Sequence, residues 1–104
     1  MAQERVDTMI TPKQRAYLRG LAQNLNAIFQ IGKNGMNENQ IKQIIDALEA
    51  RELVKISLLD TVFENKNEIA NELARQTQSD VVQVIGKKIT LYKRSKENPR
   101  IELP

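Results

Sequence analysis

The sequence lacks three residue types that carry much of protein chemistry: its 104 residues include no cysteine, no histidine and no tryptophan. Without cysteine there is no disulfide, thiol nucleophile or thiolate metal site, and without histidine there is no imidazole base or ligand. An enzyme would have to work with carboxylates, lysine, tyrosine or hydroxyl groups alone. A binding protein with no cofactor, metal or small-molecule substrate is therefore the favoured class.

Long apolar runs are also absent. No stretch approaches the roughly 18 consecutive apolar residues of a transmembrane helix, and residues 1–9 contain two acids and no apolar segment of a signal peptide. We therefore expect a cytoplasmic protein with no membrane partner. With 40% hydrophobic and 28% charged residues, the chain has the composition of one globular domain and is too short for two.

Charges of opposite sign are segregated along the chain. Residues 8–37 contain four bases and no acid, residues 38–80 contain nine acids and five bases, and residues 81–96 contain five bases and no acid. If the first and last of these segments lie together in the fold, they create one positive face on a domain of net charge +3.

Helix-capping patterns and apolar periodicity predict three helices. The first carries an apolar stripe that includes Tyr17 and Leu18, and the second ends near Arg51. Their N-termini are indicated by residue pairs three apart, namely Thr11 with Gln14 (and Pro12 between them), Asn37 with Gln40, and Asn65 with Glu68.

Runs of β-branched or alternating apolar residues predict four strands, at residues 28–31, 53–59, 81–85 and 89–93, with Gly86 in the turn between the last two. The chain order of helix, strand, helix, strand, helix, strand, strand predicts a single α/β domain of three helices packed on a four-stranded mixed sheet. Residues 1–9 are expected to form a flexible leader and residues 95–104 a mobile C-terminal tail.

The sharpest motif, Gly32-Lys33-Asn34-Gly35, lies between the first predicted strand and the second helix. A loop at this position presents backbone N–H groups beside the positive end of a helix dipole, and its glycines let a sugar-phosphate backbone approach closely. KH domains clamp nucleotides with a loop of this pattern. The alternative is that both glycines only supply positive φ angles in a tight connection.

Other basic residues have two interpretations each. Arg15 and Arg19, four residues apart, form either a phosphate-binding ridge beside the glycine loop or two solvated charges, while Lys13 falls on the opposite side of the helix. The remaining candidates are Lys87 and Lys88 at the hairpin tip and Lys93 and Arg94 after it. They either contact nucleic acid or keep the protein soluble and protect the edge of the sheet.

Aromatic residues are too sparse for a base-stacking platform, since the chain has only Tyr17, Phe29, Phe63 and Tyr92. We predict that Phe29 belongs to the core, that Tyr17 lies at its edge, and that Tyr92 can expose its ring. This scarcity favours recognition of the backbone and shape of structured RNA.

Four stretches in a specific order carry a resemblance to a known family. They are residues 10–19 with T-P-K-Q-R, residues 31–37 (I-G-K-N-G-M-N), residues 47–55 (A-L-E-A-R-E-L-V-K) and residues 82–93 (V-Q-V-I-G-K-K-I-T-L-Y-K). The sequence resembles the bacterial YhbY family, a stand-alone form of the CRM domain (chloroplast RNA splicing and ribosome maturation). The resemblance implies an RNA-binding domain over residues 10–94, with a fold similar to the C-terminal domain of translation initiation factor three. It also implies association with precursors of the large ribosomal subunit.

The sequence and the resemblance together predict a monomeric, non-enzymatic protein that binds ribosomal RNA of large-subunit precursors. The candidate RNA-binding residues are Gly32, Lys33, Asn34, Gly35, Lys13, Arg15, Arg19, Lys87, Lys88, Lys93 and Arg94. One alternative is a protein-docking or translation-factor-like module on the ribosome, in which RNA contact is secondary. Another is a small nuclease, which would need paired acids beside the basic face, yet the acids of residues 38–80 lie outside the two basic segments.

Overall fold

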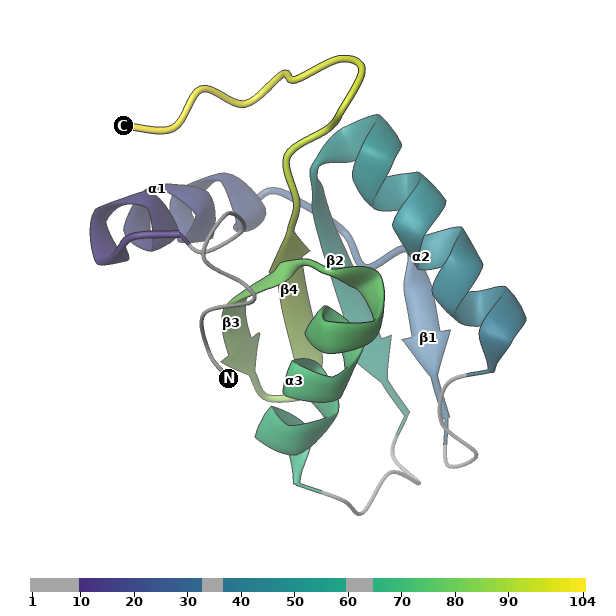
Figure 1. Cartoon of the computed structure of the whole chain (residues 1–104). Coiled ribbons are helices and arrows are strands. Elements are labelled where there is room, and N and C mark those ends of the chain that lie inside the picture. Colours follow the sequence, from purple (N-terminus) through teal and green to yellow (C-terminus); the bar gives the residue numbers. More distant parts are fainter. Residues whose placement is uncertain (1–9, 33–36, 60–64) are drawn as a thin grey trace.

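The computed structural model describes residues 10–32, 37–59 and 65–104. The elements follow the predicted order, and each strand boundary lies within one residue of its predicted position (Figure 1). They are α1 (Pro12–Ala22), β1 (Phe29–Ile31), α2 (Glu38–Arg51), β2 (Leu53–Leu58), α3 (Lys66–Thr77), β3 (Asp80–Ile85) and β4 (Lys88–Tyr92).

Side-chain caps explain where the helices begin. At α1, the Thr11 hydroxyl accepts a hydrogen bond from the Gln14 N–H at 3.1 Å, and the Gln14 side chain accepts one from the Thr11 N–H at 3.0 Å. The Asn37 side chain accepts from the Gln40 N–H at 2.7 Å, and Asn65 caps α3 in the same manner. Each cap satisfies N–H groups that have no partner inside the helix, and all three predicted N-termini are confirmed.

The strands form one mixed sheet in the order β1-β2-β4-β3. Strand β1 is parallel to β2, whereas β4 runs antiparallel to both β2 and β3, with a bulge in β3 between Val81 and Gln83. Strands β1 and β3 are therefore the two edges of the sheet. This topology confirms the predicted four-stranded mixed sheet.

The main core lies between one face of the sheet and the pair α2 and α3. Ile44 and Leu48 of α2 and Leu73 of α3 are fully buried against Ile56 and Leu91 of the central strands. Phe29 packs against the same cluster, as predicted. Because side chains alternate between the two faces of a strand, the intervening strand residues point to the opposite side.

On that opposite side, α1 covers only one end of the sheet. Leu18 and Ala22 of α1 pack against Leu53, Val82 and Tyr92, which lie where β2 and β3 begin and where β4 ends. Figure 1 shows α1 near this end and the turn between β3 and β4 at the other. The rest of this side has no helix of the described chain packed on it.

The burial of the two tyrosines tests the predictions made for them, and the prediction for Tyr92 is contradicted. Tyr92 is only 4% exposed, and Tyr17 is 44% exposed. The predicted exposure of Tyr92 is wrong because α1 packs on the face of β4 that carries its ring. The apolar stripe of α1 is also narrower than predicted, since Leu18 and Ala22 are fully buried while Tyr17 and Leu21 are partly exposed.

The C-terminal segment, residues 95–104, has neither helix nor strand but is tied to the domain. Glu52 accepts backbone hydrogen bonds from Ser95 at 2.8 Å, Arg100 at 2.6 Å and Ile101 at 2.7 Å. Glu49 accepts from the Ser95 hydroxyl and from two backbone N–H groups, those of Lys96 and Glu97. We call these two residues the carboxylate clamp. The expectation of a mobile tail is therefore revised, because periodicity cannot reveal bonds to residues more than 40 positions earlier.

Among the described residues, two other than glycine have a positive φ angle: Glu52 with φ 67° at the end of α2, and Gln78 with φ 56° at the end of α3. At Gln78 this conformation closes the helix, because its N–H and that of Ser79 both donate to the Ala74 carbonyl. Glycine is the usual residue at such a position, since it has no Cβ to strain.

We expect Gln78→Gly to raise the free energy of unfolding by about 0.5 to 1 kcal/mol, because relief of backbone strain exceeds the added entropy of the unfolded chain. Urea unfolding measures this change. The control is Gln76→Gly, an exposed position inside α3, which should lower the free energy of unfolding by roughly 1 kcal/mol. Destabilisation by both variants would contradict the interpretation.

Candidate nucleic-acid interface

The uncovered part of the sheet carries mostly polar side chains in two rows. In the row next to α1, Lys55 lies opposite Thr90, which also pairs with Gln83. In the next row, Ser57 lies opposite Lys88, with one residue of each edge strand beside them. We call this surface the open face; its residues are Gln30, Lys55, Ser57, Gln83, Ile85, Lys88 and Thr90.

Exposure varies across the open face. Thr90 is buried at its centre, while Lys55, Ser57 and Gln83 are partly exposed. Gln30, Ile85 and Lys88 are exposed. The outer row and the partly exposed residues beside it are therefore accessible to a ligand.

Helix α1 adds arginines along one border of the open face. Gln14 and Arg15 lie on the two sides of the stripe that contains Leu18, and they have different neighbours. The Gln14 side chain donates to the carbonyl of Pro104, in the segment that continues beyond the end of β4, while Arg15 Nε donates to the Val81 carbonyl at 3.3 Å. Because Gln14 is directed toward the C-terminal segment, the opposite flank of α1, which carries Arg15, is directed toward the open face. Arg19 lies one turn after Arg15 on the same flank.

The charge of this surface is uniformly positive among the described residues. Arg15, Arg19, Lys55 and Lys88 contribute four bases. The described acids lie on α2, α3, their ends and the C-terminal segment, with the exception of Asp80, which is buried at the start of β3. Clustered cations on one side of a small domain attract polyanions and raise their association rate.

At the end away from α1, the open face adjoins the hairpin and the end of β1. The Lys87 carbonyl accepts from the Leu58 N–H at 2.7 Å, and the Ile31 carbonyl accepts from the Leu59 N–H at 2.9 Å. Lys87, Leu59 and Gly32 therefore lie at the end of the sheet that is away from α1. The predicted contact residues Lys33, Asn34 and Gly35 fall outside the described residues, between Gly32 and the Asn37 cap of α2.

Gly32 does not have a positive φ angle, so that part of the alternative interpretation of the loop is wrong. Among the described glycines the positive φ, 56°, belongs to Gly86 in the hairpin turn. A Cβ added to Gly32 would lie 3.1 Å from Leu59 Cδ1. Close packing at the end of β1 therefore explains this glycine.

Arg15 and Gly32, the first residue of the glycine loop, lie at opposite edges of the sheet. Arg15 contacts β3, whereas the loop follows β1, and these strands are the opposite edges of the sheet. Three strand spacings, about 14 Å, separate the two edges. The open face, with Lys55 and Lys88 on its central strands, fills the space between them.

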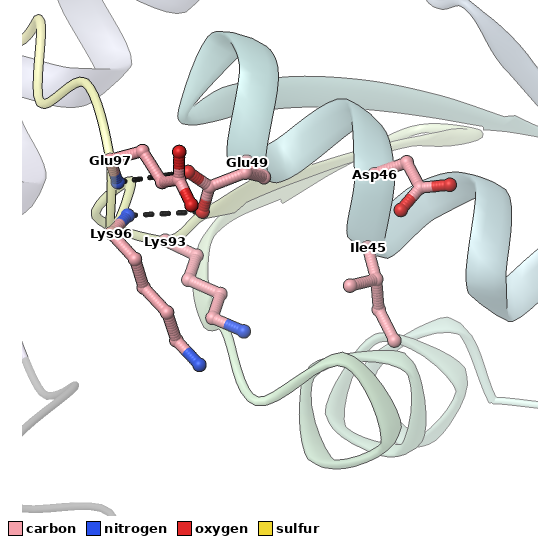
Figure 2. Close-up of a pocket in the computed structure, with 6 residues that line it drawn as sticks. All are labelled: Ile45, Asp46, Glu49, Lys93, Lys96 and Glu97. Atoms are coloured by element: carbon pink, nitrogen blue, oxygen red, sulfur yellow. Dashed lines mark hydrogen bonds between the residues drawn. The ribbon is translucent and has the colours of Figure 1, made fainter.

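Lys93 lies apart from the open face, in a pocket of about 280 Å³ beside α2 (Figure 2). The pocket is lined by Ile45, Asp46, Glu49, Lys93, Lys96 and Glu97. Burial lowers the pKa of Lys93, and the nearby Lys96 adds to that effect. With three carboxylates around two amines, this pocket suits a phosphate poorly.

Two further sequence candidates also lie outside the open face. Lys13 is exposed on the side of α1 away from the buried stripe, and Arg94 is exposed where the chain leaves β4. Sequence reasoning in turn missed Lys55, because that residue belongs to the acid-rich middle segment. The alternation of β2 marks Lys55 and Ser57 as residues of its polar side, but only the tertiary structure shows that this side is uncovered.

Within residues 10–32, 37–59 and 65–104, no helix is long and apolar enough to cross a membrane. In the same ranges, no group of three or more acidic residues is placed to hold a metal ion.

Among the described residues, the side of the sheet that α2 and α3 leave uncovered carries bases and no exposed acid, which is the pattern expected of a small nucleic-acid-binding domain. The chain is similar to known proteins whose names give such a role. It is 54% identical over 96 residues to the Probable RNA-binding protein YqeI of Bacillus subtilis, covering 92% of this chain and 100% of that one. It is 37% identical over 97 residues to an RNA-binding protein of Haemophilus influenzae, covering 93% and 97% respectively.

The solution structure of the hypothetical protein SAV1595 from Staphylococcus aureus, described as a candidate RNA-binding protein, has the same fold. It matches with a TM-score of 0.79 and 56% identity, over 92% of this chain and 100% of that chain. Residues 10–93 match the model of the CRS1 / YhbY (CRM) domain. The chain belongs to this family, which confirms the resemblance drawn from its sequence.

Proposed function

We propose that the protein binds RNA through the open face, with Arg15 and Arg19 at one border and the Gly32–Gly35 loop at the other. One observation carries the proposal: bases from separate parts of the sequence gather on one uncovered surface, which has no exposed acid among the described residues, in a chain whose relatives are named as RNA-binding proteins. Cationic side chains that contact phosphates supply most of the affinity of such surfaces.

The RNA we propose is ribosomal RNA in precursors of the large subunit, as the family resemblance implies. Crosslinking in cells followed by sequencing of the bound RNA tests this identity, and gradient sedimentation shows which ribosomal particle carries the protein. We expect crosslinks in ribosomal RNA and sedimentation with large-subunit precursors. Crosslinks spread over messenger RNA without such enrichment would contradict the proposal. Non-enzymatic action, a monomeric state and a cytoplasmic location remain predictions.

A protein-docking role is the second candidate, and one observation favours it. Tyr17 and Leu21, one turn apart on α1, are both exposed large apolar residues. Binding through such residues would change little with salt, whereas phosphate contacts weaken steeply as salt rises.

For RNA binding, we expect a plot of log affinity against log salt concentration to have a slope of about −3 to −5, which corresponds to roughly four to six phosphate contacts. Arg19→Gln and Lys33→Gln should each flatten the slope by nearly one. Lys42→Gln, an exposed base on α2, is the control with the same charge change and should leave it unchanged. A slope near zero for the parent protein would favour docking, and a slope equally reduced by all three variants would show that only net charge matters.

A further inference from the structure

The open face differs from the usual sheet surface for single-stranded nucleic acid in having no aromatic ring among its described residues. Phe29 packs in the main core, Tyr92 is buried beneath α1, and Tyr17 lies on the solvent side of α1. Proteins that bind single strands stack bases on exposed aromatic rings, and each stacked base contributes substantially to affinity. The open face cannot bind unpaired bases in that way.

Neutral hydrogen-bonding groups lie beside the lysines instead. Ser57 lies directly opposite Lys88, and Gln30 is the neighbour of Ser57 on the other side. Gln83 occupies the edge strand of the adjoining row. Hydroxyl and amide groups both donate and accept hydrogen bonds, as does the 2′-hydroxyl of ribose.

The spacing of the charges suits a sugar-phosphate backbone. Lys55 and Lys88 are diagonal neighbours on adjacent strands, a relation that places their Cα atoms about 7 to 8 Å apart. Arg15 and Arg19 form a raised border one row further along. The minor groove of A-form RNA is wide and shallow and displays 2′-hydroxyls between two phosphate backbones.

We infer that the open face takes base-paired RNA, with Ser57, Gln30 and Gln83 contacting ribose 2′-hydroxyls and Lys55, Lys88 and the α1 arginines contacting phosphates. This inference rests on the proposed RNA-binding function and adds to it the class of RNA and the residues that distinguish RNA from DNA. Base-paired RNA is bound by its shape and sugars, so the surface needs no aromatic ring.

The test uses three fluorescent probes of one sequence: an RNA hairpin, the corresponding DNA hairpin and an unpaired RNA of equal length. At a fixed salt concentration we expect the parent protein to bind the RNA hairpin at least about tenfold more tightly than either other probe, an effect equal to one or two hydrogen bonds. A double variant, Gln30→Ala with Ser57→Ala, should bring the ratio of RNA to DNA affinity close to one without changing the salt slope.

Lys55→Gln should weaken binding of both hairpins by the same factor and flatten both salt slopes. The matched control for the double variant is Asn39→Ala with Gln43→Ala, two exposed positions on α2, which should change neither ratio nor slope. Equal binding of the RNA and DNA hairpins, or tighter binding of the unpaired RNA, would overturn the inference while leaving RNA binding intact. Binding of none of the three probes would overturn the proposed function as well.

Discussion

Glu52→Gln is expected to lower the free energy of unfolding by about 3 kcal/mol or more, a large part of the stability of a small domain. The Glu52 carboxylate is 0% exposed and accepts three backbone hydrogen bonds from the C-terminal segment. A buried N–H group that loses its partner costs roughly 1 to 3 kcal/mol. The loss is therefore several times that of an ordinary surface substitution.

The glutamine variant tests the carboxylate while keeping its shape. One amide oxygen can replace the oxygen that accepts from Arg100 and Ile101, but the amide nitrogen then faces the Ser95 N–H, which is also a donor. Glu52→Gly is the complementary variant, because it removes the carboxylate but relieves the backbone strain at φ 67°. We expect it to be strongly destabilised as well, since the lost bonds outweigh the strain.

A double-mutant cycle measures how much the bonds between Glu52 and the C-terminal segment contribute to stability. Removal of residues 95–104 should cost at least as much stability, since it also removes the bonds to Glu49 and the packing of Ile101 and Leu103. Adding Glu52→Gln to the shortened protein should cost little more, because the bonds that this substitution breaks are already lost. Denaturant unfolding of the four proteins measures this coupling. Additive effects would show that Glu52 stabilises the domain independently of the C-terminal segment.

The clamp also predicts how stability depends on pH. Backbone bonds from Lys96 and Glu97, together with the Ser95 hydroxyl, lower the pKa of Glu49 to about 2. Burial raises the pKa of Glu52, but three backbone hydrogen bonds outweigh it and leave the pKa below 4.5. Depressed carboxyl pKa values stabilise the native state above the unfolded pKa near 4.5, and this contribution is lost as the pH falls toward about 2. The parent should lose more stability over this interval than Glu52→Gln.

The largest effect on binding is expected for the triple variant Arg19→Gln, Lys55→Gln, Lys88→Gln, which should weaken RNA affinity by about 100-fold or more in 0.1 M salt. Each phosphate contact contributes roughly 0.7 to 0.9 to the salt slope, which corresponds to a five- to eightfold change in affinity between 0.1 M and 1 M salt. The three side chains come from α1, β2 and β4, and they meet only on the open face. Fluorescence anisotropy with the RNA hairpin measures the change.

The matched control for the triple variant has the same change in net charge on the opposite side. Lys42, Arg51 and Lys66 belong to α2 and α3, and replacing all three by glutamine should weaken binding by less than about threefold, since only long-range attraction is lost. Urea unfolding of both triple variants shows whether either change acts through stability. Equal loss of affinity in the two variants would mean that RNA does not bind specifically to the open face.

The sequence alone determined the elements of this protein and their order, because the signals for them are local. Thr11, Asn37 and Asn65 are separated by three residues or fewer from the N–H groups they cap, and apolar periodicity marks the buried side of each element. The resemblance in four ordered stretches likewise indicated the family, which the match over residues 10–93 confirms. The absence of acids from residues 8–37 also indicated the two arginines of α1, Arg15 and Arg19, as candidates.

Only the tertiary structure decided which charges share a surface. Lys55 lies in the acidic part of the sequence yet stands diagonally beside Lys88, because β2 pairs with a strand more than 30 residues later. Lys93, only five residues after Lys88, points instead into a pocket among carboxylates. Tertiary contacts also explain two other differences from the predictions. Tyr92 is buried because α1 packs on it, and residues 95–104 are held by the Glu49 and Glu52 carboxylates. Contacts between distant parts of a chain leave no local pattern, so capping and periodicity could not reveal them.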